Sequence, residues 1–150
     1  MKTSPLRTAG KVAGILLFGL FAWFQRNDVD PEIYYKPSGL DATLWLLFYL
    51  LIAILFAVAL FRRVPKWLLV VAAIACLVQM GRSGPGLYSN FFGEESFTVT
   101  QTSMSAEDPR VELSREFFGA GLALLGVGFL HFQQRKSPAE SPAESPAGEG

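Results

Sequence analysis

The sequence lacks most of the residues on which enzyme chemistry depends. It contains one cysteine and one histidine in 150 residues, which excludes an intrachain disulfide, a zinc ribbon and a dithiol redox centre. The HExxH, GxSxG, GxGxxG and P-loop motifs are also missing. We therefore expect no catalytic residue, no cofactor and no bound metal, and we predict that the protein is not an enzyme.

Charge is missing from four long apolar segments, and its absence argues against further classes of function. No Asp, Glu, Lys or Arg occurs within residues 12–24, 42–61, 67–80 and 117–132. Proton pumps and ion carriers place ionisable groups at membrane depth, so these segments are typical of neither. Cys76 and His131 lie in two of the segments, and we expect a packing role for the cysteine and an interfacial role for the histidine.

Apolar residues are what the chain has in excess. With 51% hydrophobic and 17% charged residues, it has too little polar surface to cover four such segments in a soluble fold. The first segment ends in bulky aromatic residues, which are not a signal-peptidase site, so we interpret it as an uncleaved helix. The sequence thus predicts an all-α integral membrane four-helix bundle. We divide it into a membrane domain of residues 1–136, with spans at about 9–26, 42–61, 65–81 and 113–133 and outer loops at 27–41 and 82–112, and a disordered SPAE-repeat tail at 137–150.

The distribution of charge over the loops predicts the orientation. The totals balance at 13 basic and 13 acidic residues, so nothing indicates a nucleic-acid partner. One side of the bundle carries three acidic residues and eight basic ones, namely Lys2, Arg7, Lys11, Arg62, Arg63, Lys66, Arg135 and Lys136. The positive-inside rule makes that side cytoplasmic. We therefore predict that both termini are cytoplasmic, in a plasma or inner membrane.

Prolines and aromatic residues predict details of the helices and of the long third loop. Pro65 is expected at the start of the third helix, and Asp108 with Pro109 at the start of the fourth. Within the third loop, the Gly-Pro-Gly at 84–86 suggests a segment lying on the membrane, and "SFTVTQT" at 96–102 suggests a short strand. Four aromatic residues are expected to form interfacial belts: Trp23, Trp45, Tyr49 and Trp67.

Small residues recur on the first and fourth predicted helices. They are Gly10, Gly14 and Gly19 on the first helix, and Gly119, Ala123 and Gly126 on the fourth. Small residues allow helices to approach closely in lipid. We favour packing within one bundle, and homo-oligomerisation through the same helix faces is the alternative.

Two polar clusters, distant in the sequence, are predicted to share the outer membrane surface. The stretch "WFQRNDVDP" contributes Asn27, Asp28 and Asp30, and "VELSREFFG" contributes Glu112, Arg115 and Glu116. We favour a structural role, with an aspartate of the first stretch paired to Arg115. The alternative is a carboxylate site for a divalent cation, a cationic headgroup or a basic partner.

These clusters also carry a family resemblance that covers the chain apart from its tails. The motifs are Gln-x-Asn-Asp-x-Asp-Pro (Gln25, Asn27, Asp28, Asp30, Pro31), Trp-x-x-x-Tyr (Trp45, Tyr49) and Arg-Glu-x-x-Gly (Arg115, Glu116, Gly119). The chain resembles the transmembrane protein 220 family of small four-helix membrane proteins. The resemblance implies a fold and a topology, and it brings no established catalytic activity with it.

The function that these observations favour is that of a multi-pass membrane protein without catalytic activity. We expect it to act through lipid or protein partners at its outer polar face. One alternative is a subunit of a small oligomeric transporter or channel, which would need several copies to build a pore from uncharged helices. Another is a membrane enzyme with Asp28, Asp30, Glu112 and Glu116 as metal ligands.

Overall fold

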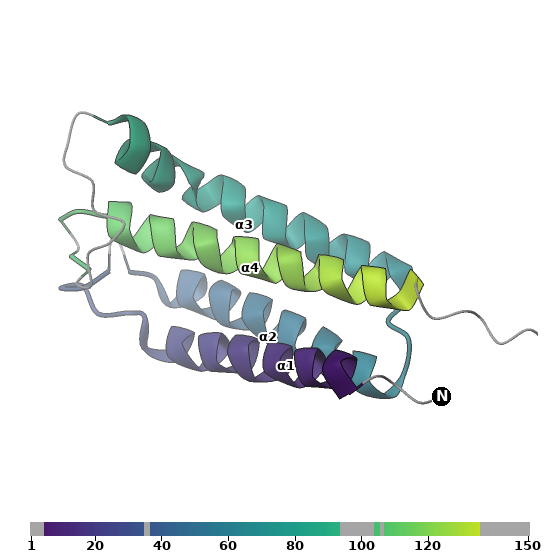
Figure 1. Ribbon diagram of the computed structural model, residues 1–150. Helices are drawn as coiled ribbons and strands as arrows, with labels where there is room; N and C mark the ends of the chain where they lie inside the picture. Colours follow the sequence, from purple (N-terminus) through teal and green to yellow (C-terminus); the bar gives the residue numbers. More distant parts are fainter. Residues whose placement is uncertain (1–4, 35–36, 94–103, 106, 136–150) are drawn as a thin grey trace, which may run out of the picture.

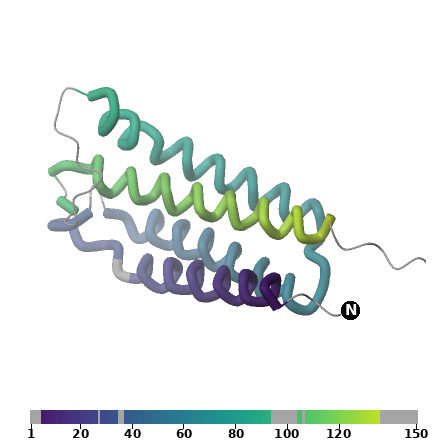
Figure 2. Tube along the Cα trace, viewed as in Figure 1, coloured from purple at the N-terminus to yellow at the C-terminus, as the bar shows by residue number. Residues whose placement is uncertain are grey.

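The computed structural model describes residues 5–34, 37–93, 104–105 and 107–135. Four long helices run side by side in an antiparallel bundle (Figure 1). They are α1 (Pro5–Phe24), α2 (Gly39–Phe61), α3 (Lys66–Phe92) and α4 (Arg110–Arg135), and a short 3-10 helix, η1 (Gln25–Asn27), follows α1 directly. The start of α1 and the end of α4 lie at the same end of the bundle, which we call the terminus end (Figure 2). The opposite end, where η1 lies with residues 28–34, 104–105 and 107–109, is the loop end.

All four helices are long and apolar enough to cross a membrane. At about 1.5 Å per residue, the 20 residues of α1 already reach the thickness of a hydrocarbon core of about 30 Å. Large apolar side chains cover the outside of the bundle, among them Leu16, Leu47, Ile54 and Leu125, each at least 45% exposed. Such a surface is stable in lipid and not in water. The predictions of a helical bundle and of a multi-pass membrane protein are therefore confirmed.

The helices associate as two close pairs, α1 with α2 and α3 with α4. Large rings fill the space around α1 and α2, where Phe18 lies 5.8 Å from Phe56 and 6.4 Å from Tyr49 between ring centroids. The facing sides of α3 and α4 carry small residues instead, including Ala72 and Ala120, both fully buried. The backbones of α3 and α4 can therefore approach closely.

The glycines predicted to pack within the bundle do so, with one exception. A methyl group added at Gly14 would overlap the ring of Phe56, and one at Gly119 would overlap the hydroxyl of Tyr49. At Gly126 the same methyl would lie 3.0 Å from Phe56, and Ala123 is fully buried. Gly10 packs against Phe129, whereas no atom of the described residues lies within 4 Å of a methyl group added at Gly19. Most of the small-residue surface is thus used inside one chain.

The third helix is longer than predicted. The expected outer loop began at residue 82, but α3 continues to Phe92 with Pro85 inside it. The prediction of a loop is therefore wrong for residues 82–92, which are helical. Pairing with α4 explains the difference, because Gly86 packs against Leu113 and Asn90 donates a hydrogen bond of 2.9 Å to Ser114. These contacts offset the weak helix propensity of the glycines and the proline.

The starts predicted for the third and fourth helices from proline and aspartate agree with the structure to within one residue. Pro65 precedes the first residue of α3, and its carbonyl accepts from the N–H groups of Leu68 and Leu69. The Asp108 carboxylate accepts a hydrogen bond of 3.1 Å from the N–H of Arg110, as a residue capping α4 does. The strand predicted at residues 96–102 and the tail at 137–150 lie outside the described residues.

Candidate functional site

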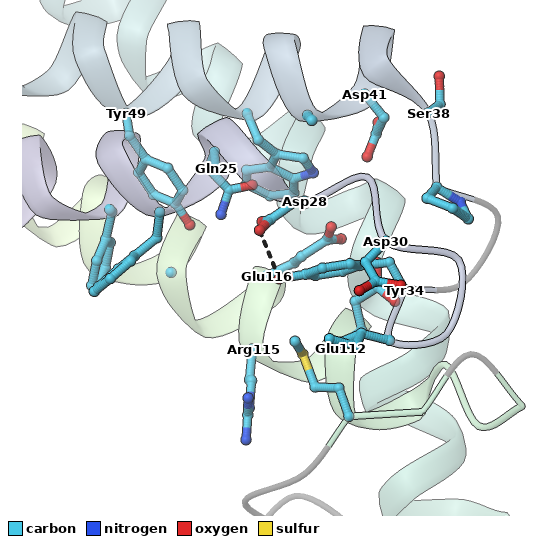
Figure 3. Close-up of a pocket in the computed structure, with 18 of the residues that line it drawn as sticks. Gln25, Asp28, Asp30, Tyr34, Ser38, Asp41, Tyr49, Glu112, Arg115 and Glu116 are labelled. Carbon is cyan, nitrogen blue, oxygen red and sulfur yellow. Dashed lines mark hydrogen bonds between the residues drawn. The ribbon is translucent and has the colours of Figure 1, made fainter.

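A cavity of about 790 Å³ lies at the loop end, between α1, α2 and α4 (Figure 3). Its volume is within the range of about 300 to 1,000 Å³ that is typical of small-molecule sites. The lining comes from the end of α1 and η1, from residues 28–34 and 37–38, from the start of α2 and from the first turns of α4. The site therefore depends on segments that only the tertiary fold brings together.

Five of the six residues predicted as an outer polar cluster line this cavity. They are Asp28 and Asp30 from the segment after η1, and Glu112, Arg115 and Glu116 from α4. The sixth, Asn27, is the last residue of η1. The sequence did not single out Asp41, which lies in the first turn of α2 and also lines the cavity. Figure 3 shows the carboxylates of Asp28, Asp41 and Glu116 turned toward a common space.

The segment after η1 is held by hydrogen bonds of its own. The hydroxyl of Tyr34 donates to Asp28 Oδ1 over 2.6 Å, and the N–H of Glu32 donates to Asp30 Oδ1 over 3.0 Å. Two further bonds run from the N–H groups of Ile33 and Tyr34 to the carbonyl of Asp30. Asp28 and Asp30 therefore have local partners that shape the loop around the cavity.

Burial affects the protonation of this loop. Desolvation raises the pKa of Asp28, and the hydrogen bond from Tyr34 opposes that rise. The pKa of Tyr34 is raised as well, first by burial and then by the carboxylate that its hydroxyl contacts. Both shifts reflect the cost of placing negative charge in a partly enclosed space.

The predicted pairing of Asp28 or Asp30 with Arg115 stays a prediction. Figure 3 shows the guanidinium of Arg115 extending away from both aspartates. Its charge nevertheless acts on the loop, since it lowers the pKa of Tyr34 against the larger effects of burial and of Asp28. Arg115 therefore belongs to the rim of the cavity, and among the described residues it contributes the one basic side chain to the lining.

Side chains of α3 hold two of the carboxylates in place from outside the cavity. Ser83 is fully buried, and its hydroxyl donates to Glu116 Oε2 over 2.7 Å. The guanidinium of Arg82 forms an ion pair with Asp41 on α2 and donates to Gln79 Oε1 over 2.9 Å. The polar residues at this end of α3 thus position the acidic wall formed by α2 and α4.

Two aromatic residues that line the cavity are buried, contrary to prediction. Trp45 and Tyr49 were expected in an interfacial belt, but they are only 2% and 4% exposed and stack on each other inside the bundle. Trp23 and Trp67 are exposed, at 59% and 65%. Trp45, Tyr49, Ile52 and Phe56 lie on one buried face of α2. No clear signal in the sequence marks this face, because the exposed face of α2 is also apolar, with Leu44, Leu47 and Ile54.

Trp45 also carries an unsatisfied polar atom. Its Nε1 is buried and has no hydrogen-bond partner among the described residues. Buried N–H groups in proteins are normally paired, and an unpaired one costs about 1 to 3 kcal/mol. Because Trp45 lines the cavity, the site includes a donor that lacks an acceptor.

The apolar side of the cavity reaches the surface of the bundle. Phe24, Phe118 and Leu122 line the cavity and are also 59%, 47% and 45% exposed. In a membrane these side chains face lipid, because they lie on apolar helices. The site therefore combines an acidic end with an apolar side that opens toward the acyl chains.

The described part of the chain contains no cluster of side chains with the geometry of a metal site. Among the described residues, no three His, Cys, Asp or Glu side chains come together as a metal site would require. Cys76 is fully buried within α3 and does not line the cavity, and His131 lies near the terminus end. The four carboxylates considered as metal ligands surround the cavity without converging on one point.

Comparison with known proteins identifies the family. Nothing among curated proteins or solved structures matches the chain significantly. A family model described as "Transmembrane family 220, helix" matches residues 17–132. The match covers α2, α3, most of α4 and the segment around the cavity, including all three motifs that carried the resemblance. The chain therefore belongs to transmembrane protein family 220.

Proposed function

We propose that this multi-pass membrane protein acts without catalysis, by binding a membrane amphiphile in the cavity at its loop end. The observation that carries the proposal is the composition of the cavity, which joins a polar end to an apolar side exposed on the lipid-facing surface. An amphiphile has the same two parts. A ligand of this kind would enter sideways from the bilayer, with its headgroup among the polar residues.

The packing below the cavity supports binding over conduction. Phe18 and Phe56 follow the cavity lining toward the middle of the bundle, and they are 2% and 3% exposed. Val127 and Leu130 fill the next turns of α4. Within the described residues, the core of one chain is thus closed by side chains, so a channel or transporter would need further copies.

We also propose that the loop end faces outward and that both termini are cytoplasmic. The charge distribution supports this orientation. In a Cys76→Ala background, a single cysteine at Glu32 should react with a membrane-impermeant thiol reagent in intact cells, and a single cysteine at Arg63 should not. Both positions are exposed at opposite ends of the bundle. Labelling at Arg63 but not at Glu32 would reverse the orientation.

Lipid binding is tested by closing the apolar side of the cavity. Leu122→Trp should reduce the lipid that remains with the purified protein, as measured by native mass spectrometry and lipid extraction. Leu125→Trp is the matched control, because Leu125 lies one turn further along α4, is 72% exposed and does not line the cavity. The proposal fails if all three proteins retain the same lipids in the same amounts.

A further inference from the structure

The charges that line the cavity are almost all negative. In the described part of the lining, Asp28, Asp30, Asp41, Glu112 and Glu116 supply five carboxyl groups, against the one guanidinium of Arg115. They come from three separate segments, namely the loop after η1, α2 and α4. Asp41 has an ion-pair partner in Arg82, and Glu116 accepts a hydrogen bond from the neutral side chain of Ser83. A headgroup that enters this end is favoured if it carries a positive charge.

The unpaired N–H of Trp45 places a second, independent requirement on the ligand. An ammonium group has donors but no acceptor, so it would leave Trp45 Nε1 unsatisfied. A ligand that carries a hydroxyl or carbonyl oxygen beside its cation would satisfy both the indole N–H and the carboxylates.

We propose that the cavity binds an ammonium amphiphile with a hydroxyl or carbonyl oxygen close to its cationic group. The ammonium group lies among the carboxylates of the loop end, with Asp28 and Glu112 on opposite walls. The oxygen accepts from Trp45 Nε1, and the alkyl chain leaves past Phe118 and Leu122. This assignment rests on the proposed function and specifies its ligand class.

Three probes with similar alkyl chains separate the two requirements. Sphingosine has an ammonium group beside hydroxyl groups, N-acetylsphingosine keeps the hydroxyls without the charge, and octadecylamine keeps the charge without an oxygen. Binding to the purified protein in maltoside detergent can be measured by microscale thermophoresis. We expect sphingosine to bind about tenfold more tightly than N-acetylsphingosine, because a hydrogen bond to a charged group contributes at least that factor. It should bind about fivefold more tightly than octadecylamine, because the indole N–H and the hydroxyl are both neutral and such a bond contributes less.

Two conservative variants assign the effects to residues. Asp28→Asn should weaken sphingosine about tenfold and leave N-acetylsphingosine unchanged, because it removes the charge and keeps an acceptor for the Tyr34 hydroxyl. Trp45→Phe should weaken sphingosine and leave octadecylamine unchanged, because it removes only the N–H and keeps a ring. Glu32→Gln is the control, since Glu32 is exposed and does not line the cavity. Thermal melting of each variant shows whether the bundle is intact.

The outcomes distinguish this inference from the proposed function. If N-acetylsphingosine or a fatty acid binds as tightly as sphingosine and Leu122→Trp prevents it, the cavity binds amphiphiles but the ligand class is wrong. If Trp45→Phe weakens octadecylamine as much as sphingosine, the role of the indole N–H is refuted. If no probe binds in a manner that Leu122→Trp prevents, the inference and the proposed function both fail.

Discussion

The two helix pairs of this bundle are held together by different kinds of contact. Between α1 and α2 and next to α4, large rings meet edge to face or stacked, with Phe18, Tyr49 and Phe56 at the centre. Between α3 and α4, small residues let the backbones approach, and buried polar groups bond across the pair. The amide of Asn90 donates to both Ser114 Oγ and the carbonyl of Arg110.

This difference explains where the site forms. Large rings hold the α1 and α2 pair away from α4, and at the loop end the rings give way to shorter polar side chains, so that a cavity remains. The closer α3 and α4 pair fixes the acidic face of α4, through Ser83 and Glu116, against that cavity. In lipid, burial of apolar surface does not drive helix association, so packing and hydrogen bonds hold the helices together.

The largest loss of stability is expected when a larger side chain is added where α3 and α4 are closest. Gly86→Val places a side chain against Leu113 and should lower the free energy of unfolding by about 3 kcal/mol, the upper end for overpacking. Unfolding by titration with SDS measures the effect. Gly84→Val is the matched control, because nothing lies within 4 Å of the added position. Equal losses in the two variants would mean that only helix propensity is being measured.

Removing a ring tests the other pair. Phe18→Ala leaves a cavity among Tyr49, Phe21 and Phe56. It should lower the free energy of unfolding by about 2 kcal/mol, because the loss scales with the volume of that cavity. The free energy of transferring the ring out of the core adds little, because the surroundings of the bundle are apolar lipid. Leu16→Ala on the same helix, at a position 68% exposed, should cost much less. If both changes cost the same in SDS titration, the rings do not organise the pair.

The start of α4 should show a small effect that depends on pH. The hydrogen bond with Arg110 holds the pKa of Asp108 below its ordinary value near 3.8. The stabilisation is therefore present above that pH and is lost as the pH falls through the lower, folded-state pKa. Asp108→Asn keeps a capping side chain but removes the charge. It should therefore lower the free energy of unfolding by about 0.5 kcal/mol at pH 7, and it should have no effect at a pH where Asp108 is already protonated. A pH-independent loss in thermal melting would assign the effect to geometry alone.

The architecture and part of the site followed from the sequence. Four uncharged apolar segments in 150 residues require a membrane, because water cannot cover them and only helices satisfy their backbone there. The starts of α3 and α4 followed from proline and aspartate chemistry, which acts within one turn. The acidic residues of the loop end were visible as two clusters, since charge next to an apolar segment marks a helix end.

What the sequence did not determine depends on contacts between distant residues. Gly84, Pro85 and Gly86 indicate a break in any local interpretation, yet α3 continues because Gly86 and Asn90 pair with α4. Trp45 and Tyr49 have the composition of an interfacial belt, but the direction of their side chains within the bundle is set by the neighbouring helices. Only the tertiary structure places the unpaired Trp45 N–H, five carboxyl groups and an opening toward lipid around one cavity, because helix packing alone decides which faces meet.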